Sequence, residues 1–175
     1  QGLGSCSVLL QGVLLQGLLL QGLLLQGVLL QGLLLQGVLL GVSIEQGCSI
    51  SIEQGVAGFG QTGQVVWNAG ALLAEHMATR LGPSFFGGKR VLELGCGTGL
   101  PGIVAARLGA SKLVLTDGTK EVIARAELNA AANLKGMPVA VSSMQLNWGE
   151  VTGKELGTFD VLLASDVSWQ NTAKI

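Results

Sequence analysis

Three glycines at alternate positions, Gly95, Gly97 and Gly99, constrain the fold of this chain more than any other feature. They follow an apolar run at residues 90–94 that predicts a buried strand, and they precede a predicted helix over 100–108 with Pro101 in its first turn. Glycine lets the backbone turn tightly and approach a ligand, while the N-terminus of the next helix presents free N–H groups. This order of elements predicts a ligand-binding crevice at the end of a strand.

Strands and helices continue to alternate along the chain. Further strands are predicted over 112–116, 139–146 and 159–165, and a second helix over 120–134. Upstream, the pattern indicates a strand at 49–53 and an amphipathic helix over 69–80, with Asn68 as its N-cap. The alternation predicts an α/β fold with a Rossmann-like, doubly wound parallel sheet.

Two acidic residues help to distinguish between the candidate ligands. Asp117 closes the second strand of the crevice, 18 residues after Gly99, where a carboxylate can bind two ribose hydroxyls. Residues 97–102 also match the pattern GxGxxG, so a nicotinamide dinucleotide is one candidate. Glu93, two residues before the first glycine, would repel a pyrophosphate but suits the cationic amino-acid end of S-adenosylmethionine. The two acids therefore favour S-adenosylmethionine.

Residues 93–102, Glu-Leu-Gly-Cys-Gly-Thr-Gly-Leu-Pro-Gly, resemble motif I of the seven-strand methyltransferases. Three other segments resemble motifs of the family 16 methyltransferases, many of which methylate protein lysines: Val-Trp-Asn-Ala at 66–69, Leu-Asn-Trp-Gly at 146–149 and Ala-Ser-Asp-Val-Ser-Trp at 164–169. The resemblance covers roughly residues 48–170. It implies a methyltransferase with S-adenosylmethionine as cofactor and a lysine-bearing protein as substrate.

The resemblance also implies a role for each matching residue. The expected cofactor-binding residues are Trp67, Glu93, Gly95, Gly97, Gly99, Asp117, Trp148 and Ala164. The expected substrate-orienting residues at the catalytic position are Asp166 and Trp169. Trp148 would lie against the adenine and Trp67 over the amino-acid end, with core packing as the alternative for both rings. Two positions depart from the family pattern, since Asn68 replaces an acid and Trp169 replaces Tyr or Phe.

In the family's fold the strand order would be 3-2-1-4-5-7-6, with the cofactor crevice beside strand 1. Only nine residues follow Asp166, so we expect a sheet truncated after the fourth strand and an incomplete substrate-facing wall. We therefore expect no methylation by the chain as it stands. The functional alternatives are a cofactor-binding remnant without activity and a small-molecule N-methyltransferase.

The N-terminal part has a different character, with six tandem Gln-Gly-Leu/Val-Leu-Leu pentads over residues 11–40. A period of five matches neither a helix nor a strand, and apolar runs of three residues are far shorter than the roughly 18 of a membrane span. We predict a low-complexity segment at 1–42, explained as a translated tandem repeat, before a partial methyltransferase domain at 43–175. A pentapeptide solenoid and a membrane-associated segment are the alternatives.

Charge and cysteine content limit the classes of ligand and partner expected for the chain. The ten basic residues all lie from Arg80 onward, mixed with acids, and the net charge is −1, so no basic run favours nucleic acid. Three separated cysteines and one histidine do not form a metal-binding pattern, so no metal is expected. The N-terminus lacks the positive residues of a secretory signal or transit peptide. We expect reduced thiols and a cytoplasmic location, with the nucleus as the alternative.

Overall fold

The computed structural model describes residues 39–44, 48–55, 62–150 and 156–167. Its strands are β1 (Leu39–Ile44), β2 (Cys48–Glu53), β3 (Arg90–Leu94), β4 (Lys112–Asp117), β5 (Ala140–Gln145) and β6 (Val161–Ala164). Its helices are the 3-10 turn η1 (Thr62–Gln64), α2 (Asn68–His76), the π-helix η2 (Met77–Leu81), α3 (Gly82–Phe86), α4 (Leu100–Arg107) and α5 (Lys120–Leu134). Within these residues no helix is long and apolar enough to cross a membrane.

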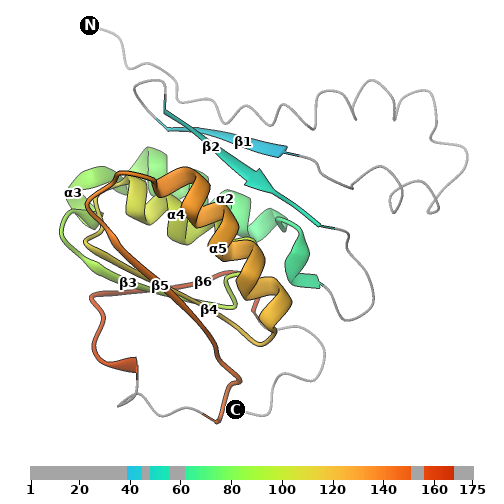
Figure 1. Cartoon of the computed structure of the whole chain (residues 1–175). Coiled ribbons are helices and arrows are strands. Elements are labelled where there is room, and N and C mark those ends of the chain that lie inside the picture. Colours follow the sequence, from blue (N-terminus) through green and yellow to red (C-terminus); the bar gives the residue numbers. More distant parts are fainter. Residues whose placement is uncertain (1–38, 45–47, 56–61, 151–155, 168–175) are drawn as a thin grey trace, which may run out of the picture.

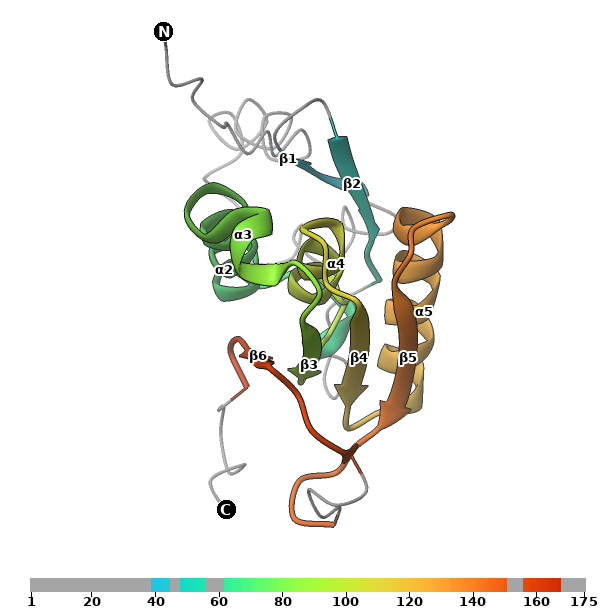
Figure 2. The ribbon, with the colours of Figure 1, turned by 90° about the vertical axis from the view of Figure 1, so that its left-hand side faces the viewer.

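Four parallel strands form the main sheet in the order β5-β4-β3-β6. Figure 2 shows β6, β3, β4 and β5 side by side in this order. In the sequence these are the fourth, first, second and third strands of the alternating region, so the order expected from the resemblance is confirmed for them. The α/β, Rossmann-like character of the sheet is confirmed as well.

The helices α2, α4 and α5 lie on one face of the sheet (Figure 1). The core between them consists of alternate strand residues such as Val91, Leu113 and Leu115, each fully buried, and of apolar helix residues. Helix α4 is the centre of this layer, because all of its residues from Leu100 to Ala106 are buried. A helix that is apolar on every side is stable only when it is covered on every side.

A third layer lies on the far side of the helices from the sheet. It is the antiparallel hairpin β1–β2, which crosses above α4 and α5 in Figure 1. Ile50 and Ile52 of β2 are fully buried and belong to the same core as the helices. Strand β2 confirms the strand predicted at 49–53, whereas β1, which begins within the last pentad, was not predicted. The domain boundary at residue 42 stays a prediction, and residues 1–38 lie outside the described part.

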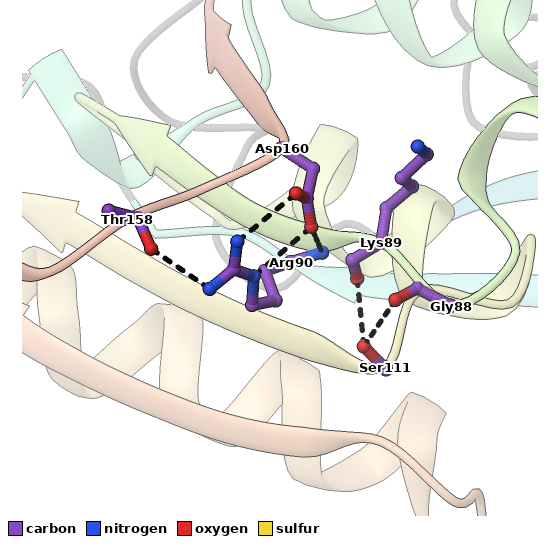
Figure 3. Close-up of polar contacts among 6 residues, drawn as sticks. All are labelled: Gly88, Lys89, Arg90, Ser111, Thr158 and Asp160. Carbon is purple, nitrogen blue, oxygen red and sulfur yellow. Dashed lines mark hydrogen bonds and ion pairs between the residues drawn. The ribbon is translucent and has the colours of Figure 1, made fainter.

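A polar cluster closes the amino-terminal edge of the sheet, away from the glycines (Figure 3). The guanidinium of Arg90 at the start of β3 binds both carboxylate oxygens of Asp160 and donates to the hydroxyl of Thr158. The backbone N–H of Arg90 also donates to Asp160, at 2.8 Å. These bonds fix the chain entering β6 against β3, and they hold the pKa of Asp160 well below its usual range, at about 2.

Helix α2 differs from the prediction at its start. Asn68 is the first helical residue and Trp67 is the N-cap, with extended backbone and no side-chain cap hydrogen bond. The prediction that Asn68 is the N-cap is therefore wrong by one position. A helix over 69–80 is confirmed, although its second half is the π-helix η2. The predicted apolar stripe is wrong, because the buried residues are Gly70, Ala74, Met77 and Ala78 and the side chain of Leu72 is 65% exposed.

Candidate functional site

The loop between β3 and α4 lies at the carboxyl ends of the strands. Gly95, Gly97 and Gly99 have φ values of +60°, +53° and +83°, which a residue with a Cβ rarely adopts. The N–H of Gly99 donates to the carbonyl of Cys96 and the N–H of Cys96 to the carbonyl of Thr116, both at 2.8 Å. The loop is therefore a defined backbone structure tied to β4, as the spacing of the glycines predicts.

Asp117, the last residue of β4, lies beside this loop. Its Oδ2 accepts a hydrogen bond of 3.0 Å from the N–H of Gly97. Among the described residues no donor reaches the other oxygen, Oδ1, and the side chain is partly exposed. One carboxylate oxygen thus organises the loop, while the second is open to a ligand.

Trp148, which follows β5, lies near Gly95 of the loop. An atom built at the Cβ position of Gly95 would lie 4.0 Å from the Trp148 ring and 2.8 Å from the side chain of Val167. Gly95 is therefore required by packing as well as by its φ value. The indole is 38% exposed, so its ring is available to a flat ligand group at this edge.

Glu93, in β3 just before the loop, is only 2% exposed and points toward α4. Its Oε2 accepts a hydrogen bond of 2.9 Å from the N–H of Gly102, one of the free N–H groups in the first turn of that helix. Burial raises the pKa of the carboxyl to about 8, the bond from Gly102 opposes the rise, and the charge of Asp117 adds to it. The contact observed for Glu93 is thus with a helix terminus, and its role toward a cofactor stays a prediction.

Cys96 lies inside the loop but is not a nucleophile. The thiol is 4% exposed, and burial raises its pKa far above the usual range, with the charges of Glu93 and Asp117 adding to the effect. A thiol that stays protonated is inert as a nucleophile. The chemistry of the loop is therefore that of binding and not of covalent catalysis.

Trp67 and η1 border the loop from the helical layer. The indole Nε1 of Trp67 donates to the carbonyl of Thr62 at 2.7 Å, and the ring is 47% exposed, which excludes core packing for it. The carbonyl of Gly63 would lie 3.4 Å from a Cβ at Gly97, so η1 packs directly against the loop. Trp67 is therefore connected to the glycine loop through η1.

The end of β6 completes the described part of this edge. Ala164 pairs in register with Leu94, the residue before the first glycine, so it lies next to the loop. Asp166 is exposed and has φ +54°, the only non-glycine residue with positive φ in the described ranges. A left-handed aspartate is uncommon, and such backbone conformations occur often at functional sites. Trp169, the second residue predicted at the catalytic position, lies outside the described residues.

Sequence reasoning missed three neighbours of the loop: Gly63, Val167 and Asn129. Asn129 donates from Nδ2 to the carbonyl of Thr98 at 3.0 Å, and it is 2% exposed. Asn129 and Asn133 lie four residues apart on α5, and both side chains are buried and bind other elements. Two amides on one apolar helical face were the available signal.

Comparison with known proteins identifies relatives of this arrangement. A family model described as lysine methyltransferase matches residues 45–174. Calmodulin-lysine N-methyltransferase of Arabidopsis thaliana is 40% identical over 90 residues, which are 50% of this chain and 30% of that protein. Protein N-lysine methyltransferase METTL21A of Danio rerio is 39% identical over 105 residues, which are 59% of this chain and 46% of that protein.

A third relative carries a different activity in its name. Histone-arginine methyltransferase METTL23 of Xenopus laevis is 33% identical over 112 residues, covering 63% of this chain and 46% of that protein. The chain therefore spans between about a third and a half of the length of these relatives. The matched stretch contains the glycine loop and Asp117, since the family model covers both.

Proposed function

Because the chain belongs to the lysine methyltransferase family, we propose that it binds S-adenosylmethionine for methyl transfer to a lysine side chain of a protein. The observation that carries the proposal is the arrangement of Asp117 and the glycine loop. Oδ2 of Asp117 holds the N–H of Gly97, and Oδ1 is left without a donor from the described protein. A carboxylate with one open oxygen, beside backbone that no Cβ obstructs, fits the vicinal hydroxyls of a ribose.

Other residues of the edge suit the remaining parts of this cofactor. The half-exposed Trp148 ring beside Gly95 offers stacking area for the adenine. We assign the exposed Trp67 to the amino-acid end of the cofactor. The negative charge of Asp117 also favours a cationic ligand. A pyrophosphate would be repelled there, so the dinucleotide alternative is disfavoured.

When bound, S-adenosylmethionine supplies a methyl group on a cationic sulfur atom. The chain contributes alignment, because a misplacement of about 1 Å can cost about a hundredfold in rate. We assign Asp166 to orientation of the acceptor, since it follows β6 at the exposed edge and is held in a left-handed conformation. A carboxylate next to a lysine would stabilise the charged ammonium, so general-base catalysis is not assigned to it.

The test is ligand binding by this chain and by an Asp117→Asn variant. Isothermal calorimetry with S-adenosylhomocysteine should show binding to the unaltered chain and about 10- to 100-fold weaker binding to Asp117→Asn, as expected for a lost charged hydrogen bond. Glu121→Gln removes an exposed acid from the first turn of α5 and is the matched control, with unchanged affinity. Binding of NAD alone, or equal affinity in both variants, would refute the proposed site.

Two activity readouts address the alternatives. Methylation of lysine-containing proteins in a lysate, followed with a labelled methyl group, would support the proposed substrate class. Tight binding without any transfer favours a cofactor-binding remnant, and transfer only to small amines favours a small-molecule N-methyltransferase.

We also propose a cytoplasmic location, with the nucleus as the alternative, which a fluorescent fusion of the chain would distinguish.

A further inference from the structure

Two asparagines of α5 hold the open edge of strand β2. Asn133 accepts a bond from the N–H of Ser51 at 2.9 Å and donates to the carbonyl of the same residue at 2.8 Å. Asn129 does the same with Glu53, at 2.8 and 3.1 Å. Each side-chain amide thus presents one acceptor and one donor to β2, as the backbone of a neighbouring strand would.

The spacing explains why two asparagines four residues apart can do this. Four residues of a helix rise about 6 Å, and two residues of a strand rise about 6.6 Å. The spacing between Asn129 and Asn133 therefore matches the spacing between Glu53 and Ser51. A two-stranded hairpin would otherwise leave the outer edge of β2 unpaired. The asparagines therefore attach the hairpin to α5 through four hydrogen bonds.

Asn129 has one further bond that Asn133 lacks. Its Nδ2 also donates to the carbonyl of Thr98, at 3.0 Å, between Gly97 and Gly99 of the loop. Asn133 instead donates to the carbonyl of Asn129 within the helix. The two residues thus make the same hydrogen bonds to β2, but only Asn129 contacts the glycine loop.

The bond to Thr98 begins a directed series across the loop. The Thr98 carbonyl belongs to the same planar peptide group as the N–H of Gly99, which donates to the carbonyl of Cys96 at 2.8 Å. That carbonyl shares its peptide group with the N–H of Gly97, which donates to Oδ2 of Asp117 at 3.0 Å. All three bonds point the same way, so the peptide dipoles reinforce one another and end on the carboxylate.

We propose that Asn129 is a positioning residue that sets the placement of Asp117 through the two peptide groups of the glycine loop. Helix α5 and the ligand-binding carboxylate are then linked through the loop. The ligand part of this inference rests on the proposed function, because Asp117 is its binding residue. Loss of the Asn129 donor frees the Thr98–Gly99 peptide to rotate, and Asp117 loses a fixed partner.

The test compares Asn129→Asp with Asn133→Asp. Each substitution has the same shape and keeps the acceptor for a β2 N–H, but removes two donated bonds. Only Asn129→Asp removes a bond to the loop. Alanine at the same two positions gives a second matched pair if a buried charge prevents folding.

Two readouts separate positioning from general stability. Amide exchange by NMR should show the N–H groups of Gly97 and Gly99 exchanging at least about tenfold faster in Asn129→Asp and unchanged within about twofold in Asn133→Asp. S-adenosylhomocysteine should bind about five- to tenfold more weakly to Asn129→Asp, with less than a twofold change in Asn133→Asp. Equal effects of the two substitutions on the loop amides, or on affinity, would overturn the inference. If the unaltered chain binds no ligand, the proposed function fails, while the exchange comparison still decides the positioning role.

Discussion

Glu93→Gln tests whether the buried carboxyl beneath α4 is held in its neutral form. Glu93 is 2% exposed, and among the described residues its carboxyl group receives one hydrogen bond, from the N–H of Gly102. Its pKa rises from 4.5 to about 8 because burial penalises the charged form, and this effect exceeds the opposing effect of the hydrogen bond. At neutral pH the folded chain therefore keeps a proton on Glu93 that the unfolded chain has released.

The sign of the pH dependence follows from this difference. Glu93 contributes its full stabilisation below pH 4.5, and the free energy of unfolding falls as the pH rises from 4.5 to about 8. Because one pKa unit corresponds to about 1.4 kcal/mol, the largest total loss is about 5 kcal/mol. A small domain is stable by only about 5–15 kcal/mol, so the loss should be large enough to measure.

Urea unfolding followed by tryptophan fluorescence, from pH 4.5 to 9, measures the effect. Glu93→Gln keeps an acceptor for the N–H of Gly102 and cannot ionise, so its stability should change much less across this range. Relative to the unaltered chain, the variant should gain stability steadily up to about pH 8 and no further. Glu121 is an exposed acid in α5, and the free energy of unfolding of Glu121→Gln should vary with pH as that of the unaltered chain does. A constant difference between Glu93→Gln and the unaltered chain at every pH would refute the reasoning.

Packing and surface charge give two more predictions. Gly102→Ala should cost about 1–3 kcal/mol in thermal unfolding because a Cβ there would lie 2.6 Å from Oε2 of Glu93. Gly70→Ala, where a Cβ would meet nothing nearer than 3.5 Å, should be neutral or stabilising by up to about 1 kcal/mol, and similar losses in both would contradict the packing argument. The stabilisation that Asp160 gains from Arg90 is present above pH 3.8 and is lost as the pH falls toward 2. Arg90→Gln should move the pKa of Asp160 back toward 3.8 in an NMR titration, and an unchanged titration would show that the guanidinium is not its cause.

The parts of the fold that local pattern controls were predictable. The strands at 90–94 and 112–116 and the helix at 120–134 agree with β3, β4 and α5 to within one residue. Apolar runs bounded by glycine predict strands, and a stripe of apolar residues at helical spacing predicts a helix. The positions of Asp117 and the glycines at one edge also follow from sequence, because the carboxyl ends of parallel strands meet there.

The parts that depend on partners far along the chain were not predictable. Strand β1 begins in a leucine-rich repeat without a period of two, and it is a strand because β2 pairs with it. The asparagines of α5 bind backbone more than 70 residues away, so no local pattern reveals their partners. Trp67 follows the same rule, because whether an indole is buried or exposed depends on what packs over it and not on its neighbours in sequence.

These non-local contacts explain how a loop of three left-handed glycines can be part of a binding site. Glycine loses more conformational freedom on ordering than other residues, so such a loop is disordered unless other groups hold it. Here the carbonyl of Thr116, the carboxylate of Asp117 and the amide of Asn129 each bind a different peptide group of the loop. The loop therefore loses its conformational entropy on folding, so a ligand that later binds to Asp117 does not have to order it. On this view affinity for the ligand depends on α5 through Asn129, although this helix does not need to touch the ligand.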